Sequence, residues 1–381
     1  MKARIAVIGA SDLQLPLILK AREMGYETHV FAWAAGDPGE EAADVFYPVS
    51  ITETDRITEI CRSIRPAGVV SIASDLAAIT VTRVANALGL PANPPETAVI
   101  AANKYEMRKA FQRAGIPVPR FTRVSAEEDP AEAYRMRLPL IVKPTDRSGS
   151  RGVCLVTDFS RLRESVEKAC AVSFEHRAII EEFIEGEEYS CECFSREGKH
   201  DCLTITKKYT TGAPHFVEYG HIQPSGLDEA ACAKVREQVF RALDALHIRC
   251  GASHSEFRIQ PGDGEIRLIE IGARMGGGCI GSDLVRLTTG CDYVEMVIRA
   301  ATGQEVPAER GEHAEAAAVR FVMNRQDYDD FLSLKRDHPE AILRMNDIRY
   351  EDREVTDSSL RFGFYIAAGP SSEELRRLLR L

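Results

Sequence analysis

Two strand-like runs flank the turn sequence PGDG, and this hairpin constrains the fold more than any other segment. The runs cover residues 253–260 and 265–272, and PGDG supplies turn-forming residues between them. If the turn is centred on Asp263, residues equally distant from it face each other, which places Glu256 opposite Glu270. Two carboxylates opposed across a ladder repel each other. The pattern therefore indicates either a cation between them or an exposed hairpin whose acids are solvated.

A hard divalent cation would remove this repulsion. Mg²⁺ (or Mn²⁺) is suited to the position, because it binds one or two carboxylates and completes its coordination with water and phosphate oxygens. Arg274 follows Glu270 by four residues and precedes the glycine run 276–278. Its guanidinium can bind phosphate or carboxylate beside the metal. The segment thus favours a polyphosphate substrate.

Length and composition limit the classes of function. A chain of 381 residues is long enough for two or three domains. Its net charge of −10 argues against nucleic acid as a partner, because phosphate backbones require a basic face. We find no apolar run of membrane-spanning length and no signal peptide, so we expect a cytoplasmic protein without a membrane partner. The ten cysteines include no CxxC pair and no zinc-like spacing, which predicts reduced thiols.

The first hundred residues alternate between strand and helix. Strands are predicted over 4–8, 28–33 and 68–73, with helices over 13–24 and 55–64. This βαβαβ order predicts a parallel sheet. The glycine fingerprint of dinucleotide-binding proteins is incomplete, since only Gly9 falls where a glycine is needed. Ser74 and Asp75 follow the third strand, where they either contact a substrate or begin a helix.

A glycine-rich loop lies between two predicted strands in the middle of the chain. Lys143 ends a buried strand, and the following loop contains Ser148, Gly149, Ser150 and Gly152. Such a loop can direct several backbone N–H groups toward a phosphate, which Lys143 would help to neutralise. The loop is not a Walker motif, because the lysine precedes it and a strand follows. An ordinary hairpin is the alternative interpretation.

The segment AIIEEFIEGEE predicts two strands joined at Gly186. The backbone around Glu182, Phe183 and Ile184 could bind the edge of a nucleobase, and Glu188 could accept hydrogen bonds from ribose. Acidic residues in a turn are also commonly solvated. Lys104, at the start of a predicted helix, is uninformative alone.

Five separated elements together resemble the ATP-grasp superfamily of carboxylate–amine ligases, over residues 1–303. They are Lys104, VKP at 142–144, SGSRG, EEFIEGEE, and the set Glu256, Glu270 and Arg274. The resemblance implies that Lys104, Lys143 and the 148–152 loop contact ATP phosphates, that Glu181, Glu182, Phe183 and Ile184 hold adenine, and that Glu188 binds ribose. It also implies Glu256 and Glu270 as Mg²⁺ ligands and Arg274 as the residue that stabilises the transferred phosphate.

One position departs from many members of that superfamily. They carry Glu-x-Asn at the second metal position, whereas Gly272 stands here in place of the asparagine. EIGAR and the segment FVEYGHIQPSG instead resemble the L-amino-acid (dipeptide) ligase branch. That resemblance implies that Glu218 and His221 face the acyl substrate, with His221 donating a hydrogen bond to a carboxylate or oxyanion. A structural histidine is the alternative.

The resemblance implies an α/β protein of three parts and a ligase activity. We expect an N-terminal doubly wound (Rossmann-like) domain over 1–95, an ATP-grasp domain over 96–303, and a small C-terminal α+β cap over 304–381 that begins with a polar connector. The reaction would activate a small carboxylate or amino acid as an acyl phosphate and join it to an amine, releasing ADP and phosphate. A bicarbonate-activating carboxylase of the same fold is the alternative. The sequence leaves open whether the protein forms a homodimer.

Overall fold

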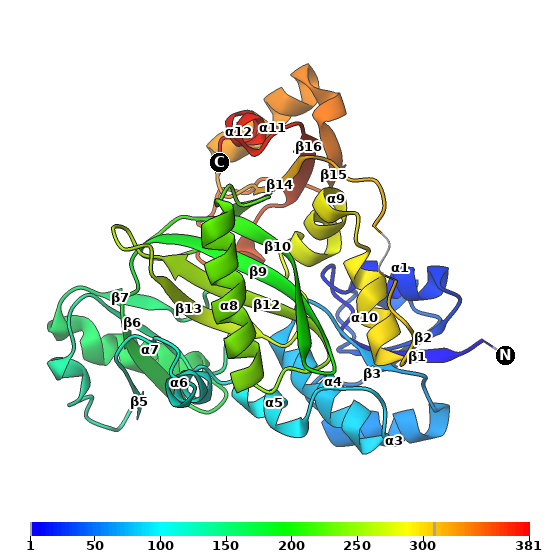
Figure 1. Cartoon of the computed structure of the whole chain (residues 1–381), viewed down its shortest axis with the longest axis horizontal. Helices are drawn as coiled ribbons and strands as arrows, with labels where there is room; N and C mark the ends of the chain where they lie inside the picture. Colours follow the sequence, from blue (N-terminus) through cyan, green and yellow to red (C-terminus); the bar gives the residue numbers. More distant parts are fainter. Residues whose placement is uncertain (1, 308–309) are drawn as a thin grey trace.

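The chain folds around three β-sheets, shown for the computed structural model in Figure 1. The structure describes residues 2–307 and 310–381. An eight-stranded sheet lies at the centre, with a four-stranded parallel sheet from the N-terminal segment on one side and a four-stranded antiparallel sheet on the other. This mixed α/β architecture confirms the predicted fold class.

The N-terminal sheet has the strand order β3-β2-β1-β4, with all neighbours parallel. Its elements are β1 (Arg4–Ile8), α1 (Leu15–Glu23), β2 (Glu27–Ala32), α2 (Pro38–Ala42), β3 (Val45–Pro48), α3 (Thr54–Ile64), β4 (Val69–Val70) and α4 (Asp75–Ala87). The predicted parallel βαβαβ unit is confirmed. The predicted strand over 68–73 is wrong in extent, since only two residues pair. Strand β3 is absent from the prediction, because it is a half-buried edge strand of only four residues.

The second four-stranded sheet has the order β5-β8-β6-β7 and is antiparallel throughout. The helices α5 (Pro95–Ile100) and α6 (Lys104–Arg113) lead into β5 (Phe121–Ser125), β6 (Leu140–Pro144), β7 (Cys154–Val156), α7 (Leu162–Val172) and β8 (Arg177–Glu182). Helix α7 covers one face, where Val166 and Ala169 pack against Val142 and Ile180. The glycine-rich loop connects β6 to β7, so it does form the turn of a hairpin.

The central sheet has the order β13-β12-β9-β10-β11-β14-β16-β15. Its first strands and helices are β9 (Glu187–Arg196), β10 (Lys199–Thr210), β11 (Glu218–Gln223), α8 (Glu229–Ala245), β12 (Gly251–Ile259) and β13 (Ile266–Gly272). Helix α8 lies across one face, where Val239 and Leu243 share a core with Tyr189 and Cys191 of β9 (Figure 1). Because side chains alternate along a strand, Glu188 of β9 faces the other side.

The β12–β13 hairpin places Glu256 opposite Glu270, as predicted. The pairing does not follow one register along its length, because Glu256 pairs with Glu270 while the adjacent Phe257 pairs with Leu268. Ile269 is therefore an extra residue, a β-bulge next to the acidic pair. The carboxylate pairing was predicted correctly although the turn is not symmetric about Asp263.

The C-terminal segment extends the central sheet. After α9 (Val285–Thr289) and α10 (Tyr293–Ala301), it contains β14 (Ala316–Phe321), α11 (Arg325–Asp337), β15 (Ile342–Met345), β16 (Phe364–Gly369) and α12 (Ser372–Leu378). Strand β14 pairs with β11, so these strands and the β12–β13 hairpin belong to one sheet. The polar connector includes residues 308–309, which lie outside the described residues. Within 2–307 and 310–381, no helix has the length and apolar character of a membrane span.

Candidate active site

A cleft of about 1040 Å³ lies between the central sheet and the β5–β8 sheet. All but two of the residues selected from the sequence line it, although they come from separate elements. These are Lys104, Lys143, Ser148, Gly149, Ser150, Glu181, Glu182, Phe183, Ile184, Glu188, Glu218, Glu256, Glu270 and Arg274. A concave site lined by many charged groups is typical of a site for a small polar ligand.

Gly152 and His221 are the two exceptions. Gly152 is packed against the chain, since a Cβ there would lie 2.6 Å from Val172 Cγ2 and 3.1 Å from Pro144 Cγ. His221 is buried on β11, with its ring edge-on to Phe321 at a centroid distance of 5.5 Å. Burial lowers the pKa of His221 to about 3, so the ring is neutral at physiological pH. It pairs in register with Lys208, beside the cleft instead of in its wall.

Each of the two opposed carboxylates is held by a lysine. Lys104 Nζ lies 3.0 Å from Glu270 Oε1 and donates to the Arg147 carbonyl at 2.6 Å. Lys208 pairs with Glu256, whose carboxylate also faces His254 Nε2 at 3.2 Å. Burial opposes ionisation of Glu256, but Lys208 and His254 outweigh it and keep its pKa well below the ordinary value. The repulsion expected from the sequence is therefore offset by the protein's own cations.

Lys208 is the most connected cation in the cleft, and the sequence analysis missed it. Besides Glu256, its Nζ lies 2.8 Å from Glu218 and 3.3 Å from Glu188. Burial alone would lower the pKa of Lys208, yet the three carboxylates raise it well above its usual value. The sequence offers only the pair Lys207 and Lys208 in a strand, one of which must face each side of the sheet.

Glu181 forms a second buried ion cluster at the edge of the cleft. Its carboxylate pairs with Arg108 and with Lys143, whose Nζ lies 2.6 Å away. Burial opposes ionisation of Glu181, but the two cations lower its pKa to about 2. Arg108 also donates to the carbonyl of the bulge residue Ile269 at 2.7 Å. The Glu181 carboxylate thus orients Lys143 beside the cleft, and Arg108 ties α6 to the β12–β13 hairpin.

Replacing Arg108 with methionine should destabilise the protein by about 3 kcal/mol, because it leaves Glu181 buried with one partner instead of two. Urea unfolding measures the difference. Arg113→Met is the matched control, since Arg113 is exposed at the end of the same helix and should shift stability by less than about 0.5 kcal/mol. Equal unfolding midpoints for the two variants would contradict this assignment.

The connection between β8 and β9 is organised by Arg258, another residue missed in the sequence. Arg258 Nη1 donates to the Ile184 carbonyl at 2.7 Å, and Nη2 lies 3.0 Å from Glu188 Oε2. Its guanidinium also lies 4.9 Å from the centre of the Phe183 ring. Arg258 therefore fixes the segment that was selected for nucleobase and ribose binding.

Arg274 joins the central sheet to helix α4 of the N-terminal segment. Its Nε and Nη2 donate to the two carboxylate oxygens of Asp75 at 2.8 and 2.9 Å. Ser74 caps α4 through the Ala77 N–H, so the capping interpretation holds for Ser74 while Asp75 lines the cleft. Among residues 2–307 and 310–381, the remaining Nη1 has one hydrogen bond, to the Met275 carbonyl at 3.4 Å, which leaves it able to bind a ligand oxygen.

The Asp75–Arg274 pair also accounts for the glycine at position 272. A Cβ on Gly272 would lie 2.7 Å from Asp75 Oδ1 and 2.9 Å from Arg274 Cζ. No larger residue fits without moving the ion pair. Glycine at this position therefore leaves room for the contact between Arg274 and Asp75.

Residues 136–283 match the family described as the ATP-grasp domain. Alanine–anticapsin ligase of Bacillus subtilis (strain 168) is 35% identical over 213 residues, which cover 50% of this chain and 44% of that protein. The chain thus spans less than half the length of this curated relative. The crystal structure of L-amino acid ligase from Bacillus licheniformis superposes with a TM-score of 0.83 at 24% identity, covering 100% and 97% of the two chains.

A second solved structure of similar fold is that of a differently named enzyme. N5-carboxyaminoimidazole synthetase from Staphylococcus aureus, complexed with ADP, superposes with a TM-score of 0.77 at 17% identity, covering 98% and 95% of the chains. Likeness at this level of identity reports the fold alone. The chain therefore contains an ATP-grasp domain, set in a fold that it shares with these enzymes along nearly its whole length.

Proposed function

We propose that the protein is an ATP-dependent carboxylate–amine ligase that activates an amino acid or another small acid as an acyl phosphate. The observation that carries the proposal is the convergence of Lys104, Lys143, Lys208 and Arg274 on one cleft that also contains the Glu256–Glu270 pair. Four cations around two opposed carboxylates suit a polyphosphate with a divalent ion. The relatedness to alanine–anticapsin ligase supports amide formation as the outcome.

Glu256 and Glu270 would hold Mg²⁺ (or Mn²⁺). Both are oxygen donors from adjacent strands and both line the cleft, which suits a hard cation. When bound, the ion supplies charge neutralisation for the phosphates during phosphoryl transfer. Lys104 and Lys208 now neutralise these carboxylates, so we propose that both lysines turn toward phosphate oxygens when nucleotide and metal enter.

The remaining roles follow from position. Lys143, oriented by Glu181, and the backbone of Ser148, Gly149 and Ser150 would bind phosphate oxygens. Glu182, Phe183 and Ile184 would contact adenine, and Glu188, held by Arg258, would accept from ribose hydroxyls.

The acyl substrate would lie between Arg274 and Glu218. His221, neutral and buried beside Lys208, would act on the substrate carboxylate as a hydrogen-bond donor after a local rearrangement, since it does not line the cleft here. We keep the three-part division at residues 95 and 303 as part of this proposal.

The substrate screen is the direct test. Pairs of amino acids supplied with ATP and Mg²⁺ should give phosphate release that requires both partners, with a product mass equal to the two acids minus one water. Lys143→Ala should abolish release while Lys207→Ala, whose ammonium pairs with the exposed Glu187, should not. Phosphate release that needs bicarbonate in place of the acid would favour the carboxylase alternative.

ATP with Mg²⁺ should protect residues 146–152 from hydrogen exchange. Lys104 Nζ donates to the Arg147 carbonyl at 2.6 Å and Ser150 Oγ to the Phe216 carbonyl at 3.0 Å, and phosphates should engage the N–H groups of the loop. NADH should give no protection, because the glycine fingerprint at Gly9 is incomplete. Protection by NADH and none by ATP would reverse the assignment.

A further inference from the structure

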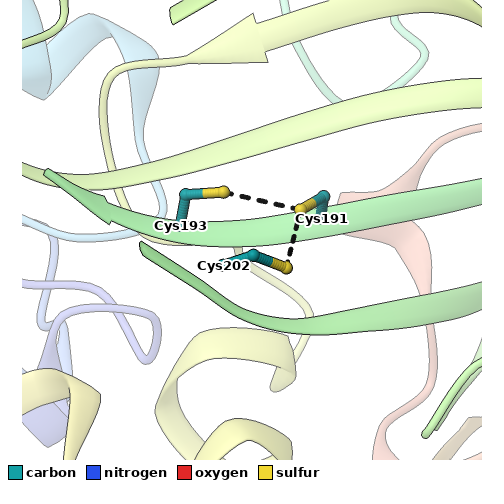
Figure 2. A group of neighbouring side chains, drawn as sticks. All are labelled: Cys191, Cys193 and Cys202. Atoms are coloured by element: carbon teal, nitrogen blue, oxygen red, sulfur yellow. Dashed lines mark hydrogen bonds between the residues drawn. The ribbon is translucent and has the colours of Figure 1, made fainter. Parts of the chain in front are cut away.

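Three cysteine sulfurs gather in the core beneath α8, on the face of the central sheet opposite the cleft. Cys191 Sγ lies 3.5 Å from Cys193 Sγ and 3.4 Å from Cys202 Sγ, and all three sulfurs lie within 4.8 Å of one another (Figure 2). Cys191 and Cys193 are fully buried and Cys202 is partly exposed. The sequence shows no metal-type spacing here, because strand pairing creates the cluster.

A bulge in β10 brings the third sulfur to this face. Cys202 pairs with Cys193, whereas Ile205 pairs with Cys191, so β10 contains one more residue than β9 between these pairs. Side chains alternate along a strand, and without the extra residue Cys202 and Ile205 would face opposite sides. The bulge thus places Cys202 on the same side as Cys191 and Cys193.

Two unsatisfied hydroxyls lie next to the sulfurs. Ser253 pairs in register with Cys193 and Ser255 with Cys191, on the neighbouring strand β12. Both serines are 0% exposed, and their Oγ atoms have no hydrogen-bond partner among the residues that the structure describes. Buried hydroxyls are rarely left unpaired in a settled core. Their position next to the sulfurs indicates that a bound ligand would provide the missing hydrogen-bond acceptors.

We propose that Cys191, Cys193 and Cys202 form a binding site for a trivalent thiophilic ion of the arsenite class. Sulfurs 3.4–3.5 Å apart can share one ion, since metal–thiolate bonds are about 2.3 Å long. Thiolates select soft ions over the hard Mg²⁺ of the cleft. Ser253 and Ser255, whose Oγ atoms make no hydrogen bond within the described part of the chain, would rotate to donate their O–H groups to the bound sulfurs, which are weak acceptors.

Charge selects the class of ion. Three thiolates neutralise a trivalent ion, whereas Zn²⁺ or Cu⁺ would leave net negative charge in an apolar core, which is costly without a partner. Lys207, the lysine of β10 on this face, is already paired with Glu187 at 2.7 Å. Val235 and Val239 of α8 are apolar neighbours of the sulfurs, and Arg236, the cation of α8 whose charge acts on Cys202, is paired with Glu229. The apolar surroundings therefore favour a complex without net charge, which three thiolates form with a trivalent ion.

The binding reaction balances without any redox step. Arsenous acid gives up its three hydroxyl groups, each of which leaves as water with the proton of one thiol. Three As–O and three S–H bonds break while three As–S and three O–H bonds form in the site and in the released water. The partly exposed Cys202 is the first sulfur that the acid can reach.

Native mass spectrometry of the reduced protein with equimolar arsenite tests the proposal. We expect one arsenic per chain with the loss of three protons, and X-ray absorption should show three sulfur neighbours. Cys191→Ala should lose the adduct, because Cys191 contacts both other sulfurs. Cys170→Ala, which removes a buried thiol in the core beneath α7, should keep it. The readout requires no turnover, so it stands apart from the proposed ligase activity.

Alkylation mapping of the unsubstituted protein covers the case in which Cys191→Ala does not fold. Arsenite should protect Cys202 from iodoacetamide and leave Cys232 of α8 reactive, although both pack against the same core. Loss of only two protons, an adduct that persists in a folded Cys191→Ala protein, or unprotected Cys202 would overturn the site. Equimolar Zn²⁺ that displaces the arsenic would overturn the charge argument.

Discussion

Glu270→Gln should lower ATP turnover by on the order of a hundredfold or more, since it removes one of two carboxylates proposed to hold the divalent ion. The loss should persist at saturating Mg²⁺, because the amide keeps the shape of the side chain but not its charge. Glu256→Gln should behave alike. Coupled measurement of ADP formation across a Mg²⁺ titration gives the effect on rate and on apparent metal affinity together.

Glu265→Gln is the matched control, because Glu265 lies on the same hairpin at the exposed turn, where it pairs with Arg267. It should turn over ATP normally. In Glu270→Gln, Lys104 loses its carboxylate partner and keeps the Arg147 carbonyl, which can lower the stability of the fold. The unfolding curve of each variant is therefore measured together with its rate. Near-normal turnover in Glu256→Gln or Glu270→Gln would remove that residue from the metal site.

The hairpin shows what local sequence can predict and where it stops. Turn residues and alternation are local signals that predict the hairpin, whereas the pairing of Glu256 with Glu270 also requires the bulge at Ile269, which offsets the asymmetry of the turn. The local pattern does not predict this bulge, whose carbonyl accepts a hydrogen bond from Arg108 of α6. The β10 bulge that gathers the cysteines has no local signal in the sequence either.

The parts of the site that were missed are ion pairs between distant segments. Arg108, Lys208 and Arg258 are unremarkable in sequence, since arginines and lysines on strands and helices are usually solvated. Their burial can be recognised only in the folded structure, where acidic partners from other segments surround them, as Glu188 and Glu218 do for Lys208. The family motif predicted residues that line the cleft, whereas the residues that orient them were not predicted.

Arg274→Ala should reduce formation of the activated acid about a hundredfold, which corresponds to losing about 3 kcal/mol of transition-state stabilisation. Hydroxylamine traps an acyl phosphate as a stable hydroxamate, so hydroxamate yield per unit time measures this step directly. Nucleotide affinity should change far less, because Lys104 and Lys143 remain. A variant that loses ATP binding in proportion to trapping would indicate a role in binding the nucleotide instead.

Asp75→Asn separates positioning from direct contact. Asp75 holds two nitrogens of Arg274, and the asparagine keeps one acceptor oxygen, so we expect trapping to fall about tenfold. Arg274→Lys keeps the charge but cannot make the paired hydrogen bonds to Asp75. Its hydroxamate trapping should therefore be closer to that of Arg274→Ala than to that of the native protein. If Asp75→Asn and Arg274→Ala reduced hydroxamate trapping equally, Arg274 would act only through its contact with Asp75 of α4.

The same trapping assay distinguishes the two reactions that this fold supports. A ligase should form ADP only with its carboxylic acid present and should give the hydroxamate of that acid. A carboxylase should instead require bicarbonate and give no hydroxamate of any amino acid. Because Arg274 and the Glu256–Glu270 pair would serve phosphoryl transfer in either case, their variants cannot decide between the two. Bicarbonate-dependent ADP formation with a carboxylated product would overturn the amide-ligase assignment and leave the site's phosphoryl-transfer role standing.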